Sequence, residues 1–163
     1  MNTSNPLLID EIGDLLKSGV TDVFNTMFNL NAQPAELTEI RGDGDTLVAG
    51  SVGFVGNVNG VVYIYLRAPF ARKLTGLMLG IPEEEVDENE MVGDAIGEMS
   101  NMVVGSTKSR ICDAGSSCKL TIPSVVRGQH LNTGSVHSSQ TLLMSMACDS
   151  ELFMIELIMQ PTT

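Results

Sequence analysis

The sequence has few basic residues. Nine lysines and arginines stand against twenty aspartates and glutamates, for a formal net charge of −11, and they form no basic run. Proteins that bind nucleic acid or anionic membranes need a surplus of Lys and Arg to neutralise phosphate groups. The composition therefore argues against a nucleic-acid partner and against a membrane surface, and it leaves a protein partner or a small molecule.

Cysteine is also scarce and has no recognisable spacing. Cys112, Cys118 and Cys148 are odd in number and form no CxxC pair, and together with His130 and His137 they match no zinc pattern. We therefore expect free thiols in a reducing compartment and no metal site.

Long apolar segments are missing as well. The longest strongly apolar run, at 61–66, is far too short to span a bilayer, and the first ten residues lack the features of a signal peptide. We therefore expect a cytoplasmic protein. The 163 residues, 43% of them hydrophobic and 18% charged, have the composition of an ordinary globular chain and fit a single domain over 1–163.

Two long segments have helical periodicity. Apolar residues recur at helical spacing over 6–29, where Ser4 or Asn5 would cap the helix. A second long helix is expected to begin near Asp87, in a sequence that resembles a capping box. A short helix is predicted between them, over 70–79.

The remaining segments have strand patterns, at 35–41, 46–56, 60–66, 119–122, 141–148 and 152–159. Asp-Gly and Asn-Gly turn signals separate the first three, which predicts an antiparallel meander. The last is apolar on both faces, so it is expected to be covered on both sides or to lie at a subunit contact. The resulting fold class is α+β, in the order α-βββ-α-α-βββ, with long helices packed on an antiparallel sheet.

The helix over 91–108 carries the candidate site. Asp94, Glu98, Asn101 and Gly105 fall within an arc of about 60°, and apolar residues occupy the opposite side. An acid and an amide three residues apart lie one above the other, with roughly 5–6 Å between their Cβ atoms. Small residues flank them, so few bulky side chains would block another molecule. From spacing alone, an ordinary solvated helix face is the simpler interpretation.

A resemblance to a known family adds to this pattern. The segment DAIGEMSNMVVGSTK resembles the signature helix of the CheC/CheX/FliY phosphatases, Asp/Ser-x3-Glu-x2-Asn, which Asp94, Glu98 and Asn101 match without gaps. The flanking segments NVNGVVYIYL, PFARKLTGLMLG and LTIPSVVRG resemble the CheX branch of the family. The similarity covers most of 46–128. It implies a CheC-like fold and hydrolysis of the aspartyl phosphate of a CheY-type response regulator.

The same resemblance implies roles for the polar and small residues Asp94, Glu98, Asn101 and Gly105 on one side of this helix, which we call the stripe. Asn101 would orient the attacking water, and Glu98 would pair with the regulator's lysine beside the phosphoryl group. Asp94, Gly97 and Gly105 would contact the partner. Phosphoryl transfer depends mostly on positioning and charge stabilisation, and the regulator brings its own Mg²⁺, so the chain would need no cofactor of its own. CheX relatives form homodimers, and the resemblance implies a homodimer here.

Other interpretations stay open. The same stripe would serve a non-catalytic module that binds a response regulator or a flagellar or chemoreceptor-array protein. An unrelated metabolic enzyme is poorly supported, since the sequence has no P-loop, no GxGxxG after a strand and no GxSxG elbow. Ser18, Asp22 and Asn25 on the first helix repeat the signature spacing. The shorter reach of Asp22 favours a degenerate site or a chance match there over a second working site.

Overall fold

The computed structural model describes residues 7–133 and 139–160. Within them the fold is α+β, as expected, with three α-helices and seven strands in an antiparallel sheet. The elements are α1 (Ile9–Phe28), β1 (Ala32–Ala35), β2 (Leu47–Gly56), β3 (Asn59–Arg67), α2 (Ala68–Leu79), α3 (Glu90–Asp113), β4 (Cys118–Leu120), β5 (Ser124–Gly128), β6 (Gln140–Cys148) and β7 (Glu151–Gln160). None of the helices in this described part of the chain is long and apolar enough to cross a membrane.

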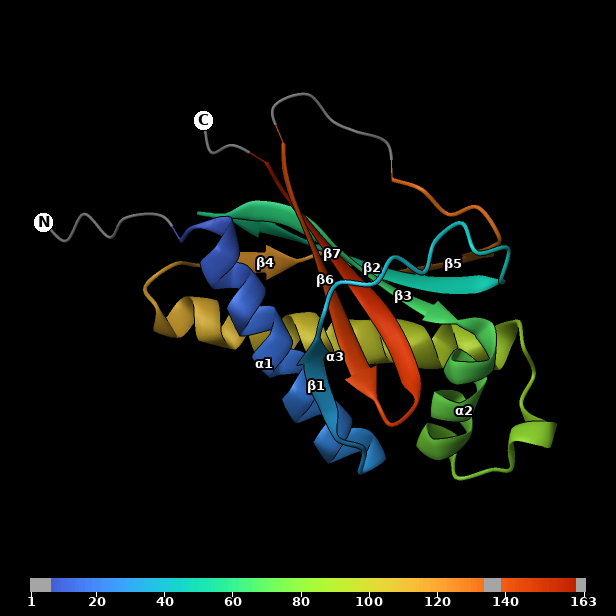
Figure 1. Ribbon diagram of the computed structural model, residues 1–163. Coiled ribbons are helices and arrows are strands. Elements are labelled where there is room, and N and C mark those ends of the chain that lie inside the picture. Colours follow the sequence, from blue (N-terminus) through green and yellow to red (C-terminus); the bar gives the residue numbers. More distant parts are fainter. Residues whose placement is uncertain (1–6, 134–138, 161–163) are drawn as a thin grey trace, which may run out of the picture.

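A single sheet organises the chain. Its strand order is β1-β6-β7-β3-β2-β4, and β5 also pairs with β2. The hairpin of β2 and β3, which the Asn-Gly signal predicts, is confirmed, and β6 and β7 form a second hairpin. Figure 1 shows the three helices on the same side of the sheet. Alternate strand residues point to that side and form the main core with the helices.

The other face of the sheet has a smaller core, which we call the outer cluster. Its buried members are Ile40, Leu47, Ala49, Tyr65 and Met154. Ile40 and the partly buried Leu131 come from two segments that leave the sheet, 36–46 and 129–133. Strand β7 therefore contributes to both cores. The expectation that this strand is covered on both sides is confirmed within one chain, and no subunit contact is needed to bury it.

A buried carboxylate ties the covering segments to β7. Glu156, only 4% exposed, accepts hydrogen bonds from the hydroxyls of Tyr65 at 2.9 Å and Thr133 at 2.8 Å. Arg41 Nη1 donates to the same carboxylate at 3.3 Å, and its guanidinium lies 5.1 Å from the centre of the Tyr65 ring. Sequence reasoning missed this network, although an acid in the middle of an apolar strand was a visible signal.

The prediction of a strand over 35–41 is wrong. Strand β1 ends at Ala35 and pairs with β6 instead of β2, so the three-stranded meander does not form. Beyond Ala35 the chain lies across the outer face and buries Ile40. Residues 36–39 are exposed and only Ile40 is buried, so this segment lacks the alternation of buried and exposed residues that a strand of the sheet would have.

The strand predicted over 119–122 also needs correction. Strand β4 ends at Leu120, and β5, which sequence reasoning missed, begins at Ser124. Both pair with β2, and Pro123 lies between them. Proline has no N–H to donate, so it interrupts strand pairing. The observed order is therefore α-βββ-α-α-ββββ.

The helix boundaries differ slightly from the predicted ones. Helix α1 begins at Ile9, and the predicted caps Ser4 and Asn5 lie outside the described residues. Helix α2 begins two residues earlier than predicted and is followed by Gly80 with a left-handed φ of 69°. Glycine adopts this conformation without steric cost, so it ends the helix at the expected place.

Candidate functional site

Helix α3 begins at Glu90, three residues after the predicted start, and its N-cap Asn89 makes no side-chain capping bond. The Oδ2 atom of Asp87 accepts a hydrogen bond of 2.9 Å from the backbone N–H of Glu90, but the Asp87 N–H donates to the sulfur of Met91, so only half of the predicted capping box forms. Three exposed acids at 83–85 precede it, and negative charge is favourable before the N-terminus of a helix. From this start α3 runs along the helix side of the sheet (Figure 1). Its buried side includes Val92, Ile96, Met99 and Val103, as the periodicity predicts.

Two glycines on neighbouring elements allow α3 to approach closely. An ideal Cβ on Gly50 of β2 would overlap the hydroxyl oxygen of Ser100, and one on Gly19 of α1 would lie 2.9 Å from Thr107 Oγ1. Both hydroxyls are buried and donate to carbonyl oxygens one turn earlier in α3, at 2.7 and 2.9 Å. The helix is thus packed against β2 and α1, and this packing orients its outer side.

The acid and amide of the signature lie on that outer side. Asp94 and Glu98 are exposed, and Asn101 is half-buried. Within residues 7–133 and 139–160, none of these three side chains makes a hydrogen bond or an ion pair. The carboxylate of Glu98 and the carboxamide of Asn101, about one helical turn apart, are therefore available to bind another molecule.

Of the two glycines predicted to contact the partner, Gly97 is buried and Gly105 is half-buried, but tight packing explains neither. An ideal Cβ on Gly97 would lie 3.5 Å from Val125, and one on Gly105 would lie 3.9 Å from Leu120. Both distances are ordinary van der Waals contacts. Glycine inside a helix costs about 0.5–1 kcal/mol relative to alanine. The same two contacts bring β5 and β4 alongside the stripe, so that a sheet edge borders the candidate site.

The repeat of the signature on α1 is differently placed. Ser18, Asp22 and Asn25 are all exposed, but the carboxylate of Asp22 forms an ion pair with Arg110 of α3. Arg110 also donates to the hydroxyl of Ser106. The carboxylate of Asp22 is therefore paired with Arg110 and joins the two helices, whereas the carboxylate of Glu98 has no such partner among the described residues.

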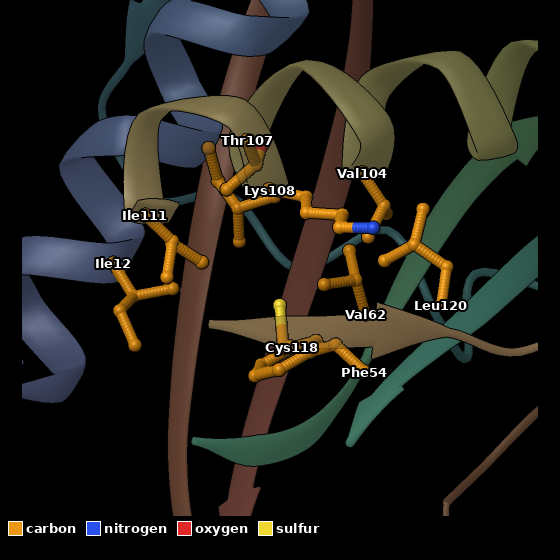
Figure 2. A pocket seen from close by; sticks show the side chains of 10 residues that line it. Ile12, Phe54, Val62, Val104, Thr107, Lys108, Ile111, Cys118 and Leu120 are labelled. Carbon is orange, nitrogen blue, oxygen red and sulfur yellow. The ribbon is translucent and has the colours of Figure 1, made fainter. Parts of the chain in front are cut away.

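A small apolar cavity lies between α1, the C-terminal half of α3 and the sheet. Figure 2 shows side chains from α1, α3, β2, β3 and β4 around it, with the thiol of Cys118 directed toward its centre. The stem of Lys108 lies at its rim. Burial raises the pKa of the Cys118 thiol, so the thiol stays protonated at neutral pH. The cavity is a small packing defect in the core, and its lining includes no paired acid and base.

The candidate metal ligands of the sequence do not gather. Cys112 is exposed, whereas Cys118 and Cys148 are buried, and all three are free thiols. His130 is exposed, and His137 lies outside the described residues. Across 7–133 and 139–160 there is no group of three His, Cys, Asp or Glu side chains that would hold a metal ion.

Comparison with known families and structures decides the classification. A family profile described as chemotaxis phosphatase CheX matches residues 48–147, which contain α2, α3 and the strands on either side of them. The chain belongs to the CheX family. A search among curated proteins finds no match.

Solved structures of CheX proteins share the fold. CheX from Vibrio vulnificus is 26% identical, with a TM-score of 0.78 over 92% of this chain and 97% of that one. CheX from Desulfovibrio desulfuricans is 22% identical, with the same TM-score over 92% and 99%. A chain of the CheX–CheY–BeF3–Mg²⁺ complex from Borrelia burgdorferi is 18% identical, with a TM-score of 0.72 over 92% and 98%.

Proposed function

We propose that this CheX-family protein dephosphorylates the aspartyl phosphate of a CheY-type response regulator. Helix α3 enters the phosphorylation pocket of the regulator. The carboxamide of Asn101 orients a water molecule in line with the phosphorus atom, and the carboxylate of Glu98 pairs with the lysine beside the phosphoryl group. The regulator supplies the Mg²⁺ and the phosphorylated aspartate, so this chain contributes no cofactor.

The proposal rests on one observation, the lack of a hydrogen-bond or ion-pair partner for Glu98 and Asn101 within the described part of the chain. Glu98 and Asn101 lie on the exposed side of a firmly packed helix and have no partner among the described residues. An amide accepts a hydrogen bond from water without adding a full negative charge near the phosphoryl oxygens. A water positioned in this way performs the role that a glutamine performs in GTPases.

Membership of a family described as chemotaxis phosphatases supports the choice of reaction. The Borrelia burgdorferi complex supports the choice of partner, because it joins a CheX protein to CheY in the presence of Mg²⁺ and BeF3. BeF3 stands in there for the phosphoryl group. In this chain, Asp94 and the half-buried Gly105 would contact the regulator around the catalytic pair, whereas Gly97, also expected there from the sequence, is buried beside Val125 of β5. A cytoplasmic location and a homodimer, both expected from the sequence, remain part of the proposal.

The decay of a phosphorylated regulator tests the function. CheY-type regulators encoded in the same genome are phosphorylated with acetyl phosphate and Mg²⁺, and loss of the phosphoryl group is followed with and without this protein. Catalytic amounts should accelerate the loss for at least one regulator. Unchanged decay for every regulator would overturn the proposal, and binding without acceleration would identify a non-catalytic module.

A further inference from the structure

The edge strand beside the candidate site contains a bulge. Phe54 of β2 pairs with Leu120, and Ser51 pairs with Ser124. Between these two pairs, two residues of β2 face three of the edge strand, Thr121 to Pro123. Bulges of this kind occur often near functional sites, where they redirect a side chain.

Local contacts hold the bulge in place. The Thr121 N–H donates to the carbonyl oxygen of Gly53 at 2.9 Å, and the Thr121 hydroxyl accepts from the Gly53 N–H at 2.8 Å. An ideal Cβ on Gly53 would lie only 3.0 Å from the Thr121 side chain, so glycine there leaves room for it. Pro123 has no N–H to donate. The backbone at this point is therefore constrained, which fixes where the side chain between Thr121 and Pro123 leaves the chain.

That side chain is Ile122, which is 89% exposed and is the most exposed large hydrophobic residue among 7–133 and 139–160. Two contacts place it along α3. Val125 lies against Gly97, and Leu120 lies against Gly105. Asn101 is midway between the two glycines, and the bulge is midway between the valine and the leucine. The bulge that carries Ile122 therefore borders the stretch of α3 between Gly97 and Gly105, which includes Asn101.

We infer that Ile122 is an apolar anchor for the phosphorylated response regulator, contacting an apolar surface at the rim of its phosphorylation pocket. The inference rests on the proposed function and is supported by continuity with the exposed Glu98 and Asn101. A second copy of this chain fits the edge at Ile122 less well, because a bulge and a proline both oppose the addition of a strand to a sheet edge. Ile122 contributes affinity and leaves the chemical step to Asn101.

Steady-state kinetics with Ile122→Ser tests this inference. The regulator concentration at half-maximal rate should rise by about tenfold or more, the usual effect of removing a buried apolar anchor from an interface. The maximal rate should stay unchanged, and Ile122→Leu should restore most of the affinity. Leu37→Ser is the matched control, because Leu37 is also an exposed large apolar residue, at 55%, but belongs to the segment between β1 and β2.

Three results would overturn the inference. They are an unchanged half-saturation concentration, a loss confined to the maximal rate, and a change in oligomeric state by light scattering that accounts for the loss of activity. If the wild-type protein binds a BeF3-loaded regulator but does not accelerate phosphate loss, the proposed catalysis fails. Weaker binding of Ile122→Ser to that regulator would then still support the anchor. If the wild type binds no regulator, both proposals fall.

Discussion

Ser100 of α3 lies against Gly50 of β2 so closely that a Cβ at position 50 would overlap the serine hydroxyl oxygen and lie 3.1 Å from its Cβ. Rotating the hydroxyl away would remove only the first of these conflicts, and it would break the hydrogen bond from Ser100 to the Ile96 carbonyl oxygen. The distance between the candidate catalytic helix and the sheet therefore depends on residue 50 being a glycine, which has no side chain.

Gly50→Ala should lower the free energy of unfolding by about 1–3 kcal/mol, the usual cost of overpacking a core. Urea titration followed by circular dichroism measures the loss. Gly93→Ala is the control, because an ideal Cβ there meets no atom within 4 Å in the described residues. It should be neutral or stabilising by up to about 1 kcal/mol, since alanine is the better helix former. Equal stability of Gly50→Ala and wild type would contradict the close packing.

Asn101→Ala should reduce accelerated dephosphorylation by about a hundredfold or more, as removal of a catalytic hydrogen-bonding group usually does. Asn101→Asp should lose activity too, because it keeps the shape but adds negative charge where the phosphoryl oxygens approach. Binding to a BeF3-loaded regulator should fall much less than activity in Asn101→Ala. Full activity of Asn101→Ala would refute the mechanism even if the protein is a phosphatase.

Glu98→Gln tests the charge of the acid while keeping its length. Its regulator concentration at half-maximal rate should rise by about tenfold or more, because the lysine of the regulator would lose its ionic partner. Affinity should also depend less on salt concentration than in the wild type. Glu36→Gln, which changes an exposed acid outside the stripe, is the control for net charge. The same loss of affinity in both variants would remove the specific role of Glu98.

Asp22→Ala asks whether α1 carries a second working site. Because the Asp22 carboxylate is paired with Arg110 at the surface, we expect unchanged dephosphorylation and a stability loss of less than about 1 kcal/mol. Phosphate-release kinetics and thermal unfolding measure the two effects. A loss of activity as large as that of Asn101→Ala would instead establish a second site.

The buried thiols predict sensitivity to alkaline pH. Burial raises the pKa of both Cys118 and Cys148. Below the ordinary thiol pKa of about 8.5, both states of the protein keep these protons. As the pH rises further the unfolded chain loses them first, so the free energy of unfolding falls until the folded-state pKa is passed. Urea titrations between pH 7.5 and 10 should show this fall.

Cys118→Val is the control for this pH dependence, because it keeps an apolar side chain of similar size. Its stability should decline less steeply with pH than that of the wild type. Parallel curves for the two proteins would contradict a raised pKa at Cys118.

The features that sequence alone predicted correctly depend on neighbours along the chain. The buried side of α3 follows from the spacing of Val92, Ile96 and Met99, and Asp87 indicated its start to within three residues. The same periodicity places Glu98 on the opposite, exposed side of the helix. Local periodicity and a family signature were therefore enough to identify the helix and the stripe.

The features that sequence missed depend on residues far apart. Ala32 of β1 faces Cys148 of β6, and no local signal distinguishes this pairing from one with β2. Strand β5 was missed because Pro123 interrupts the pattern at the point where the sheet edge continues. The ion pair of Asp22 with Arg110 likewise requires two helices to be packed before it is visible.

The central position of β7 has a consequence for synthesis of the protein. This strand is the last described element of the chain, yet it is hydrogen-bonded between β3 and β6, in the middle of the sheet. While the chain emerges from the ribosome, β3 therefore has one unpaired edge until β7 arrives. Helix α3 is already outside by then, but the sheet on which it rests is incomplete, so a nascent chain that stops before β7 should be unable to engage a regulator.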